Sequence, residues 1–217
     1  MTRLIWAILL TIMLLPLSFT SNVKAQEHNM LSDADKEAGW KLLFDGKTLL
    51  GWVNRGGAAN WMVENGELTG EKLGRGPGYI GTFNEYTNYE LHVEFNQDAG
   101  HNSGVFLRGP KNPMSGVNQY NFYEINIADT HSSGFITGSI VNLHKYEVMP
   151  QTEGKWNTLD ITAKGRDISV MLNGEESAKI KDRGHYTGVI VLQAFGEGKI
   201  RFRNVKIREM EKIYYSW

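Results

Sequence analysis

The sequence predicts an all-β protein, built as a sandwich or barrel of antiparallel strands. From Trp40 onward, apolar and polar side chains alternate with the period of two that a β-strand requires. Two Asn-Gly pairs, at 65–66 and 173–174, lie between such segments, and Asn-Gly favours the positive φ angles of a tight hairpin. We expect about ten to twelve short strands and one short helix, and no linker divides them, so they form one domain.

The expected elements follow in order along the chain. Residues 31–39 predict the short N-terminal helix, because Ser32 can cap its first turn and Gly39 can end it. In residues 89–95, the Tyr, Leu, Val and Phe side chains share one face, whereas the two Glu and the His share the other. The remaining predicted strands are 60–64, 66–69, 103–108, 120–128, 137–143, 156–162, 167–172, 188–194 and 199–207.

Residues 1–25 are typical of a cleavable signal peptide, which leaves residues 26–217 as the single β domain. Arg3 gives a positive start, an apolar run to Phe19 follows, and the small side chains of Val23 and Ala25 suit a signal peptidase. The alternative is an uncleaved anchor, but the apolar run is short for a membrane span of ~20 residues. We therefore expect a periplasmic or secreted protein that has no membrane attachment after cleavage.

The composition excludes several classes of function. The chain has no cysteine, so disulfides, thiol catalysis, cysteine zinc sites and a lipid on an N-terminal cysteine are excluded. The formal net charge is -1 with no basic stripe, which argues against a nucleic-acid partner. The six histidines form no metal-binding motif, so no cofactor is expected to be required, although a structural Ca²⁺ in a loop rich in Asp and Asn is left open.

Several motifs resemble one bacterial family, and they occur in the same order. The run EAGWKLLFDGKTLLGW at 37–52 is similar to a family phrase close to GW-x-x-LFDGKTL-x-GW. The later motifs are WMVENGEL at 61–68, NSGVFLR at 102–108, YEINIAD at 123–129, TGSI at 137–140 and RFRNVKI at 201–207. By these motifs, roughly residues 31–209 resemble the 3-keto-disaccharide hydrolase domain family, long classed as a domain of unknown function.

This resemblance implies a fold and an activity. The fold is an antiparallel jelly-roll sandwich of the concanavalin A-like lectin and glucanase superfamily, and the activity is on sugars oxidised at carbon 3. Lectin-like glucanases carry their carboxylates on an E-x-D-x-x-E strand, whereas this chain has Glu124, Asn126 and Asp129 at those places. Since the middle carboxylate is an amide (and Asn stands where the family commonly has Gln), the ordinary mechanism with a carboxylate pair is weakened.

A keto sugar needs fewer groups, namely one base and one stabiliser of the enolate oxygen. Strand alternation puts Arg108, Glu124, Asn126 and Gln193 on outward faces, where a concave sheet would make them line a groove; a merely solvated face is the alternative. As catalytic candidates, either Glu124 or His144 is the base and the other protonates the leaving oxygen. Arg108 would stabilise the enolate, and Asp129 would orient a histidine.

The remaining candidates would bind substrate. Asn126 and Gln193 would read sugar hydroxyls, Tyr120 and Phe122 would contact a sugar ring, and His131 stands close to Asp129 in the sequence. Asp129, His131 and His144 could also form a metal site or an acid/base set, and of these two a metal is the less expected.

The function predicted is thus that of an exported carbohydrate-active hydrolase that cleaves 3-keto-glycosides by elimination and hydration. Its partners would be an oligosaccharide or glycoside substrate and an upstream oxidoreductase that makes the keto sugar. The alternatives are a non-catalytic carbohydrate-binding module and an exported structural or adhesion domain.

Overall fold

A computed structural model describes residues 28–211 of the chain. The predicted signal peptide, residues 1–25, lies outside the described residues. Within 28–211, none of the helical structure is long and apolar enough to span a membrane.

The described chain is almost entirely β-structure, with one short helix near its start. The elements are α1 (Asp33–Glu37), β1 (Lys41–Leu42), β2 (Trp52–Gly57), β3 (Ala59–Glu64), β4 (Glu67–Lys72), β5 (Gly78–Thr82), β6 (Tyr89–Gln97), β7 (Ser103–Gly109), β8 (Tyr123–Ile127), β9 (Asn157–Lys164), β10 (Asp167–Leu172), β11 (Glu175–Lys181), β12 (Val189–Ala194) and β13 (Lys199–Glu209).

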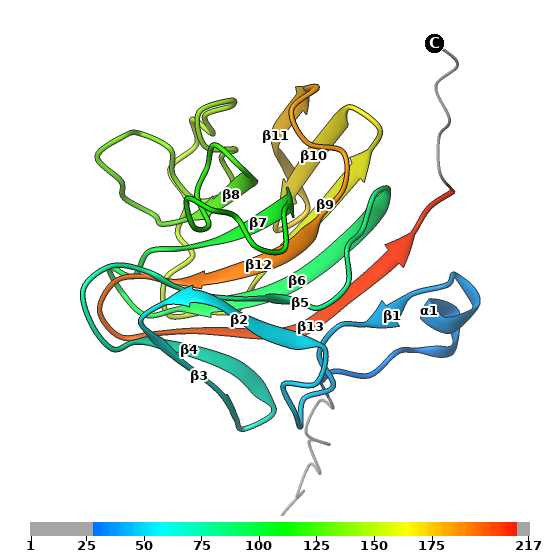
Figure 1. Cartoon of the computed structure of the whole chain (residues 1–217), viewed down its shortest axis with the longest axis horizontal. Coiled ribbons are helices and arrows are strands. Elements are labelled where there is room, and N and C mark those ends of the chain that lie inside the picture. The colour runs from blue at the N-terminus through cyan, green and yellow to red at the C-terminus, as the bar shows by residue number, and fades with distance from the viewer. Residues whose placement is uncertain (1–27, 212–217) are drawn as a thin grey trace, which may run out of the picture.

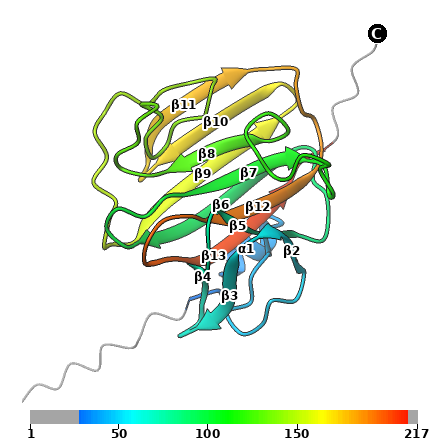
Figure 2. The same ribbon diagram turned by 60° about the vertical axis from the view of Figure 1, so that its left-hand side comes forward.

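The strands form two antiparallel sheets that pack face to face. The larger sheet has the order β11-β10-β9-β6-β13-β4-β3, with β1 paired to β13, and the smaller sheet has the order β2-β5-β12-β7-β8. Figures 1 and 2 show the two layers, with the loops between β7 and β8 and after β8 gathered over the smaller sheet. This arrangement confirms the predicted all-β antiparallel jelly-roll sandwich with one short N-terminal helix.

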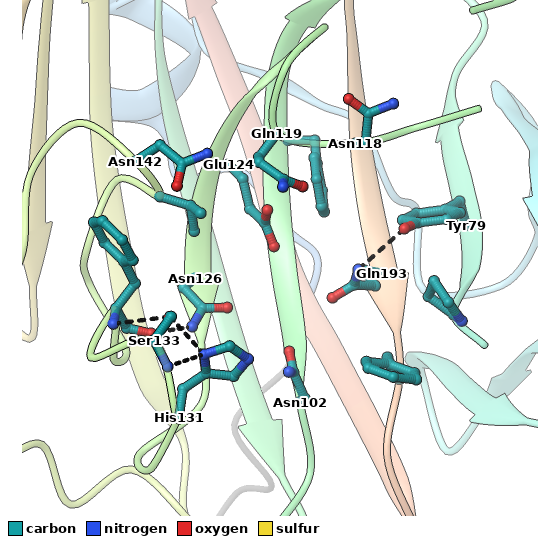
Figure 3. Close-up of a pocket in the computed structure, with 15 residues that line it drawn as sticks. Tyr79, Asn102, Asn118, Gln119, Glu124, Asn126, His131, Ser133, Asn142 and Gln193 are labelled. Atoms are coloured by element: carbon teal, nitrogen blue, oxygen red, sulfur yellow. Dashed lines mark hydrogen bonds between the residues drawn. The ribbon is translucent and has the colours of Figure 1, made fainter. Parts of the chain in front are cut away.

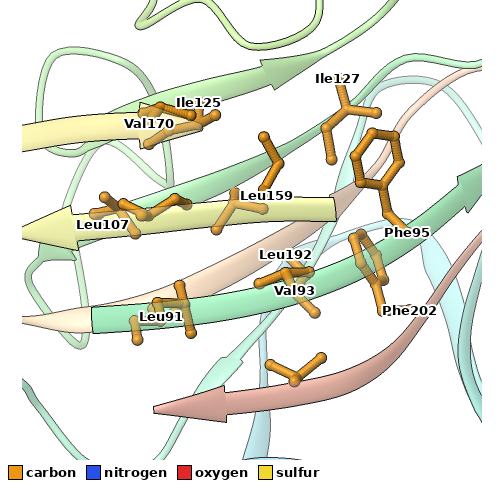
Figure 4. Close-up of a cluster of buried hydrophobic side chains, with 14 of the residues drawn as sticks. Leu91, Val93, Phe95, Leu107, Ile125, Ile127, Leu159, Val170, Leu192 and Phe202 are labelled. Atoms are coloured by element: carbon orange, nitrogen blue, oxygen red, sulfur yellow. The ribbon is translucent and has the colours of Figure 1, made fainter. Parts of the chain in front are cut away.

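The main hydrophobic core lies between the two sheets. Period-two alternation supplies it, because Leu91, Val93 and Phe95 of β6 are buried while the residues between them are half-buried. Leu107 and Leu192 of the smaller sheet face these side chains (Figure 4). Burying a side chain of this size contributes about 1.5–3 kcal/mol, so the core is the main stabilising element.

Local signals in the sequence place the turns as predicted. Asn65 and Gly66 both have positive φ between β3 and β4, and Asn173 and Gly174 repeat this conformation between β10 and β11. At the start of α1, the Ser32 hydroxyl accepts a hydrogen bond from the Asp35 backbone, and the Asp35 carboxylate accepts one from the Ser32 backbone.

One predicted strand, residues 137–143, is wrong. The segment runs beside β8 and exchanges backbone hydrogen bonds with it, but Ile140 alone forms bridges, to Ile125 and to His144. Gly138 and Asn142 have φ of 90° and 65°, and these left-handed residues break the extended run.

Two strands of the smaller sheet were missed, β2 and β5. Both are rich in glycine and lack the alternation that predicts a strand. In β5 a side chain at Gly78 would meet Ala59 at 2.3 Å, so the absence of a Cβ atom there permits the close approach.

Candidate functional site

A pocket of about 270 Å³ hollows the outer face of the smaller sheet (Figure 3). Strands β5, β12, β7 and β8 form its floor, and the segments 118–119 and 131–142 form its sides. Its lining consists mainly of neutral amides and rings: Pro77, Tyr79, Asn102, Phe106, Asn118, Gln119, Glu124, Asn126, His131, Ser133, Phe135, Val141, Asn142, Gln193 and Phe195.

Strand alternation positions the floor of this pocket. On β8, Ile125 and Ile127 enter the core, so Glu124 and Asn126 face outward into the pocket. On β12, Leu192 enters the core and Gln193 faces the pocket in the same way. The predicted outward placement is confirmed for Glu124, Asn126 and Gln193.

Glu124 is the acidic group of the pocket. Burial raises the pKa of its carboxyl to about 7, because removing water disfavours the charged form. Within residues 28–211, burial is the one cause of this shift, with no hydrogen bond or ion pair contributing, and Glu124 is the one carboxylic acid that lines the pocket. A carboxylate that titrates near neutral pH and is free of protein partners is suited to act as a general base.

Opposite Glu124, Tyr79 and Gln193 form a hydrogen-bonded pair. Gln193 Nε2 donates to the Tyr79 hydroxyl over 3.2 Å, and the Oε1 atom of Gln193 is buried without a partner. Burial raises the pKa of the Tyr79 hydroxyl, the hydrogen bond from Gln193 opposes the rise, and the negative charge of Glu124 adds to it. The hydroxyl therefore stays protonated at neutral pH.

Asn126 and His131 lie across the pocket from Tyr79 and Gln193, on the same side as Glu124. Asn126 Nδ2 donates to the carbonyl oxygen of Phe135, which fixes the side chain and leaves its own carbonyl oxygen available. His131 Nδ1 lies 2.7 Å from the Ser133 hydroxyl and accepts from the Ser133 backbone nitrogen at 3.3 Å. With Nδ1 as the acceptor, Nε2 carries the ring hydrogen and can donate a hydrogen bond.

Arg108 does not line the pocket, so its predicted outward placement is wrong. The reason is a β-bulge in β7, where Val189 pairs with Gly109 but Val191 pairs with Phe106. Arg108 occupies the extra position with φ of 57°, and a bulge re-aims the side chain that it carries.

The re-aimed guanidinium is 2% exposed and joins three loops. Its Nε donates to the carbonyl oxygen of Thr87 over 2.9 Å, and Nη1 donates to those of Gly165 at 2.8 Å and His185 at 3.4 Å. These contacts give Arg108 a structural position, and it is not available to an enolate in the pocket.

Asp129 also lies outside the pocket and contacts no histidine among the described residues. Its carboxylate accepts hydrogen bonds from the Thr137 hydroxyl at 2.8 Å and from both the backbone nitrogen and the hydroxyl of Thr152 at 2.5 Å. Gln97 and the Glu153 backbone donate longer bonds to it. Asp129 thereby ties the segments around 137 and 152 to the end of β8, so the prediction that it orients a histidine is wrong.

The other candidates divide between the pocket and its surroundings. His131 lines the pocket, whereas His144 is exposed and does not. Tyr120 is 78% exposed on the loop before β8 and lies outside the lining. Phe122 is buried beneath that loop, where its ring meets Phe106 edge to face at 6.0 Å, so it supports the pocket wall instead of contacting a ligand.

Sequence reasoning missed Tyr79, Asn102 and Asn142. Tyr79 belongs to β5, which has no alternation, and Asn142 owes its place to a left-handed turn, so neither carried a local signal. Asn102 opens the NSG motif quoted above, and that motif was the one available indication. Within residues 28–211, no three His, Asp or Glu residues gather as metal ligands would.

The chain is a two-sheet β-sandwich with a polar, amide-lined pocket on one outer face. Comparison with solved structures finds the same fold. A candidate glycosyl hydrolase from Parabacteroides distasonis superposes with a TM-score of 0.75 over 85% of this chain and 100% of its own, at 23% identity. Carbohydrate-binding module CBM66 from Bacillus subtilis gives a TM-score of 0.55 over 72% of this chain and 94% of its own, at 16% identity.

Sequence comparison then identifies the family. Residues 39–208 match the 3-keto-alpha-glucoside-1,2-lyase-like domain, and the chain belongs to this family. A protein named 3-keto-disaccharide hydrolase, from Bacteroides thetaiotaomicron, is 32% identical over 101 residues. That match covers 41% of this chain and 34% of the relative. The chain is thus a member of a carbohydrate-active, hydrolase-like family, as its motifs predicted.

Proposed function

We propose that this protein cleaves the glycosidic bond of 3-keto-glycosides by elimination followed by hydration, with Glu124 as the base. The single observation that carries the proposal is the state of Glu124, a partly buried carboxyl in an amide-lined pocket with its pKa raised to about 7. The family membership and the name of the relative support the same substrate class.

The reaction uses the acidity that a ketone gives to its neighbours. The carboxylate of Glu124 removes the proton on carbon 2, and the C–H electrons form an enolate between carbons 2 and 3. When the ketone re-forms, a double bond develops between carbons 1 and 2 and the C1–O bond breaks. The leaving oxygen takes the proton that Glu124 has just gained, and His131 Nε2 can donate a hydrogen bond to that oxygen. Water then adds across the new double bond, its hydroxyl to carbon 1 and a proton to carbon 2, which leaves Glu124 as the carboxylate again.

One carboxylate in the lining favours this route over an ordinary glycosidase mechanism. Retaining and inverting glycosidases place two carboxyl groups about 5–9.5 Å apart across the bond. Among the described residues that line the pocket, Glu124 has no second carboxylate to pair with. Asn126, Gln193, Asn102 and Asn142 are then left to read hydroxyl groups.

Carbohydrate binding without cleavage is the second candidate, and the likeness to CBM66 favours it. A product assay with a native and a 3-keto disaccharide side by side separates the two. Cleavage of the keto sugar alone is the expected result, and cleavage of the native sugar alone would contradict the proposal. Binding with no product from either sugar would establish the binding module. Repeating the assay with a chelator tests the structural Ca²⁺, for which we expect no requirement.

Two further proposals concern where the protein works and what acts before it. Export through cleavage after Ala25 predicts a mature protein that begins at Gln26, which N-terminal sequencing of the protein from culture checks. A 3-keto glycoside arises by two-electron oxidation of the hydroxyl group on carbon 3 of the sugar, so we propose that an oxidoreductase acting on sugar hydroxyl groups supplies the substrate.

A further inference from the structure

The pair formed by Tyr79 and Gln193 offers an unused donor, the Tyr79 hydroxyl hydrogen, beside an unused acceptor, Gln193 Oε1. Gln193 is 6% exposed and faces the pocket, and its Oε1 atom has no hydrogen-bond partner in the protein. Its Nε2 donates to the Tyr79 hydroxyl over 3.2 Å, so the phenolic oxygen accepts and the phenolic hydrogen is left over. Figure 3 shows both side chains directed toward the space in front of Glu124.

Leaving a buried carbonyl oxygen unpaired is costly, about 1–3 kcal/mol for a polar group of this kind. Other buried atoms, such as Gln97 Oε1, also lack a protein partner, but Gln97 lies outside the pocket, whereas Gln193 lines it and a ligand can reach its oxygen. An unpaired acceptor fixed next to a spare donor is therefore best explained by a ligand that supplies the missing partner.

A fixed donor beside a fixed acceptor matches a carbonyl oxygen next to a hydroxyl group. We propose that Tyr79 and Gln193 form the subsite that recognises the α-hydroxyketone of the oxidised sugar, with Tyr79 donating to the ketone oxygen and Gln193 Oε1 accepting from the hydroxyl on the adjacent carbon 4. A sugar that is not oxidised offers a hydroxyl group in place of the ketone and makes a poorer acceptor for Tyr79. The pair thus selects the oxidised ring.

The same hydroxyl takes the role for which the sequence suggested Arg108. Neither arginine nor lysine is among the described residues that line the pocket. As the enolate forms, negative charge moves onto the oxygen at carbon 3, where a fixed hydrogen-bond donor in a partly enclosed site stabilises it. Tyr79 suits this task because it is held by Gln193 and by an edge-to-face contact with Phe106, at 5.7 Å between ring centres.

This inference rests on the proposed function, and exchange of the carbon 2 proton separates the two. The probe is a 3-keto glucoside in deuterated buffer, in which removal and return of that proton introduces deuterium. The variant is Tyr79→Phe, which keeps the ring contact with Phe106 and removes the hydroxyl. The matched control is Tyr186→Phe, because Tyr186 lies outside the pocket and its hydroxyl also accepts one hydrogen bond, from Arg166.

We expect Tyr79→Phe to slow exchange and cleavage by about 100-fold, the typical loss of one oxyanion donor. Tyr186→Phe should stay within about 3-fold of wild type. Equal exchange by wild type and Tyr79→Phe, with both proteins folded, would overturn the inference and leave the proposed function intact. Absence of exchange in the wild-type protein would instead overturn the proposed function on which the inference rests.

A second variant tests the acceptor. Gln193→Met removes Oε1 at similar volume, and calorimetry in a Glu124→Gln background, which prevents cleavage, compares a 3-keto glucoside with its 4-deoxy analogue. The protein with Gln193 should bind the 4-deoxy sugar at least about 10-fold more weakly, because Gln193 Oε1 then loses its partner. Gln193→Met should bind the two sugars within about 3-fold of each other. The same 10-fold preference in both proteins would show that Gln193 does not read this hydroxyl.

Discussion

Two groups of buried polar side chains on the smaller sheet differ in how completely they are paired. Arg108 and Asp129 each make several short hydrogen bonds to the protein, and neither lines the pocket. Glu124 and Gln193 line the pocket: Gln193 Oε1 is buried without a partner, and burial alone shifts the pKa of the Glu124 carboxyl, with no hydrogen bond contributing. All four were candidate site residues from the sequence, and their pairing now separates the residues that hold the fold from those that can meet a ligand.

The difference has a physical basis. A buried polar group that is satisfied by the protein stabilises the native state, whereas one that is not satisfied costs free energy until a ligand pairs with it. Removing a paired group should therefore lower stability, and removing an unpaired group should leave stability unchanged or raise it while function is lost. Four predictions follow this contrast, from the largest change in unfolding free energy to the smallest.

Replacing Arg108 should lower the free energy of unfolding the most. Arg108→Met removes the charged donor from the carbonyl oxygens of Thr87 and Gly165 and leaves them buried, so we expect the free energy of unfolding to fall by about 3 kcal/mol. Urea denaturation measures this change. Arg183→Met, at an exposed position, is the control and should stay within about 0.5 kcal/mol of wild type. An equally small change for Arg108→Met would contradict the structural role given to Arg108.

Asp129→Asn should lower the free energy of unfolding by less than Arg108→Met does, because it keeps the shape of the side chain. The new amide turns one acceptor into a donor that faces donors of Thr152, and we expect a loss of about 2 kcal/mol in the same denaturation experiment. Asp167→Asn, at the exposed first residue of β10, provides the comparison and should change stability by no more than about 0.5 kcal/mol. If both variants lose the same amount, the pairing of Asp129 is not what matters.

Glu124→Gln should raise stability at alkaline pH. Folding raises the pKa of Glu124 from 4.5 to about 7. Below pH 4.5 the carboxyl is therefore protonated in both the folded and the unfolded state, and its ionisation does not lower the free energy of unfolding. As the pH rises from 4.5 to 7, the unfolded chain ionises first, and the wild-type fold is destabilised. At ~1.4 kcal/mol per pKa unit, discounted by about half because solvent still reaches the carboxyl, the variant gains about 1.5 kcal/mol at pH 8. Denaturation at pH 4 and pH 8 checks this, and a gain that is equal at both values would contradict it.

His144→Ala should have the smallest effect. His144 is exposed and lies outside the pocket, so we expect a change within about 0.5 kcal/mol in stability and within about 3-fold in cleavage of a 3-keto glucoside. Denaturation and the product assay measure the two quantities. A large loss of cleavage by a folded variant would extend the site beyond the pocket and restore His144 as a candidate base.

The fold was predictable because its signals are local. Alternation on β6 and β8, the two Asn-Gly turns and the Ser32 cap each act within a few residues. The outward placement of Glu124 and Gln193 followed from the same alternation.

Arg108 could not be placed in this way, because its direction depends on a bulge that exists only when β7 pairs with β12. Tyr79 was missed for a similar reason, since the glycine-rich β5 is a strand only through its neighbours on both sides. Which polar groups end up paired is a property of the assembled loops, and that property separates Asp129 from Glu124.

The central claim is that Glu124 is the base of this pocket, and deuterium exchange at carbon 2 of a 3-keto disaccharide tests it most directly. The comparison is wild type against Glu124→Gln at pH 8, where the variant is expected to be at least as stable as wild type, so lost exchange cannot be ascribed to unfolding. We predict exchange by the wild-type protein and a rate about 1,000-fold lower for the variant, within the range that general-base catalysis supplies. Exchange by folded Glu124→Gln at the wild-type rate would contradict the account.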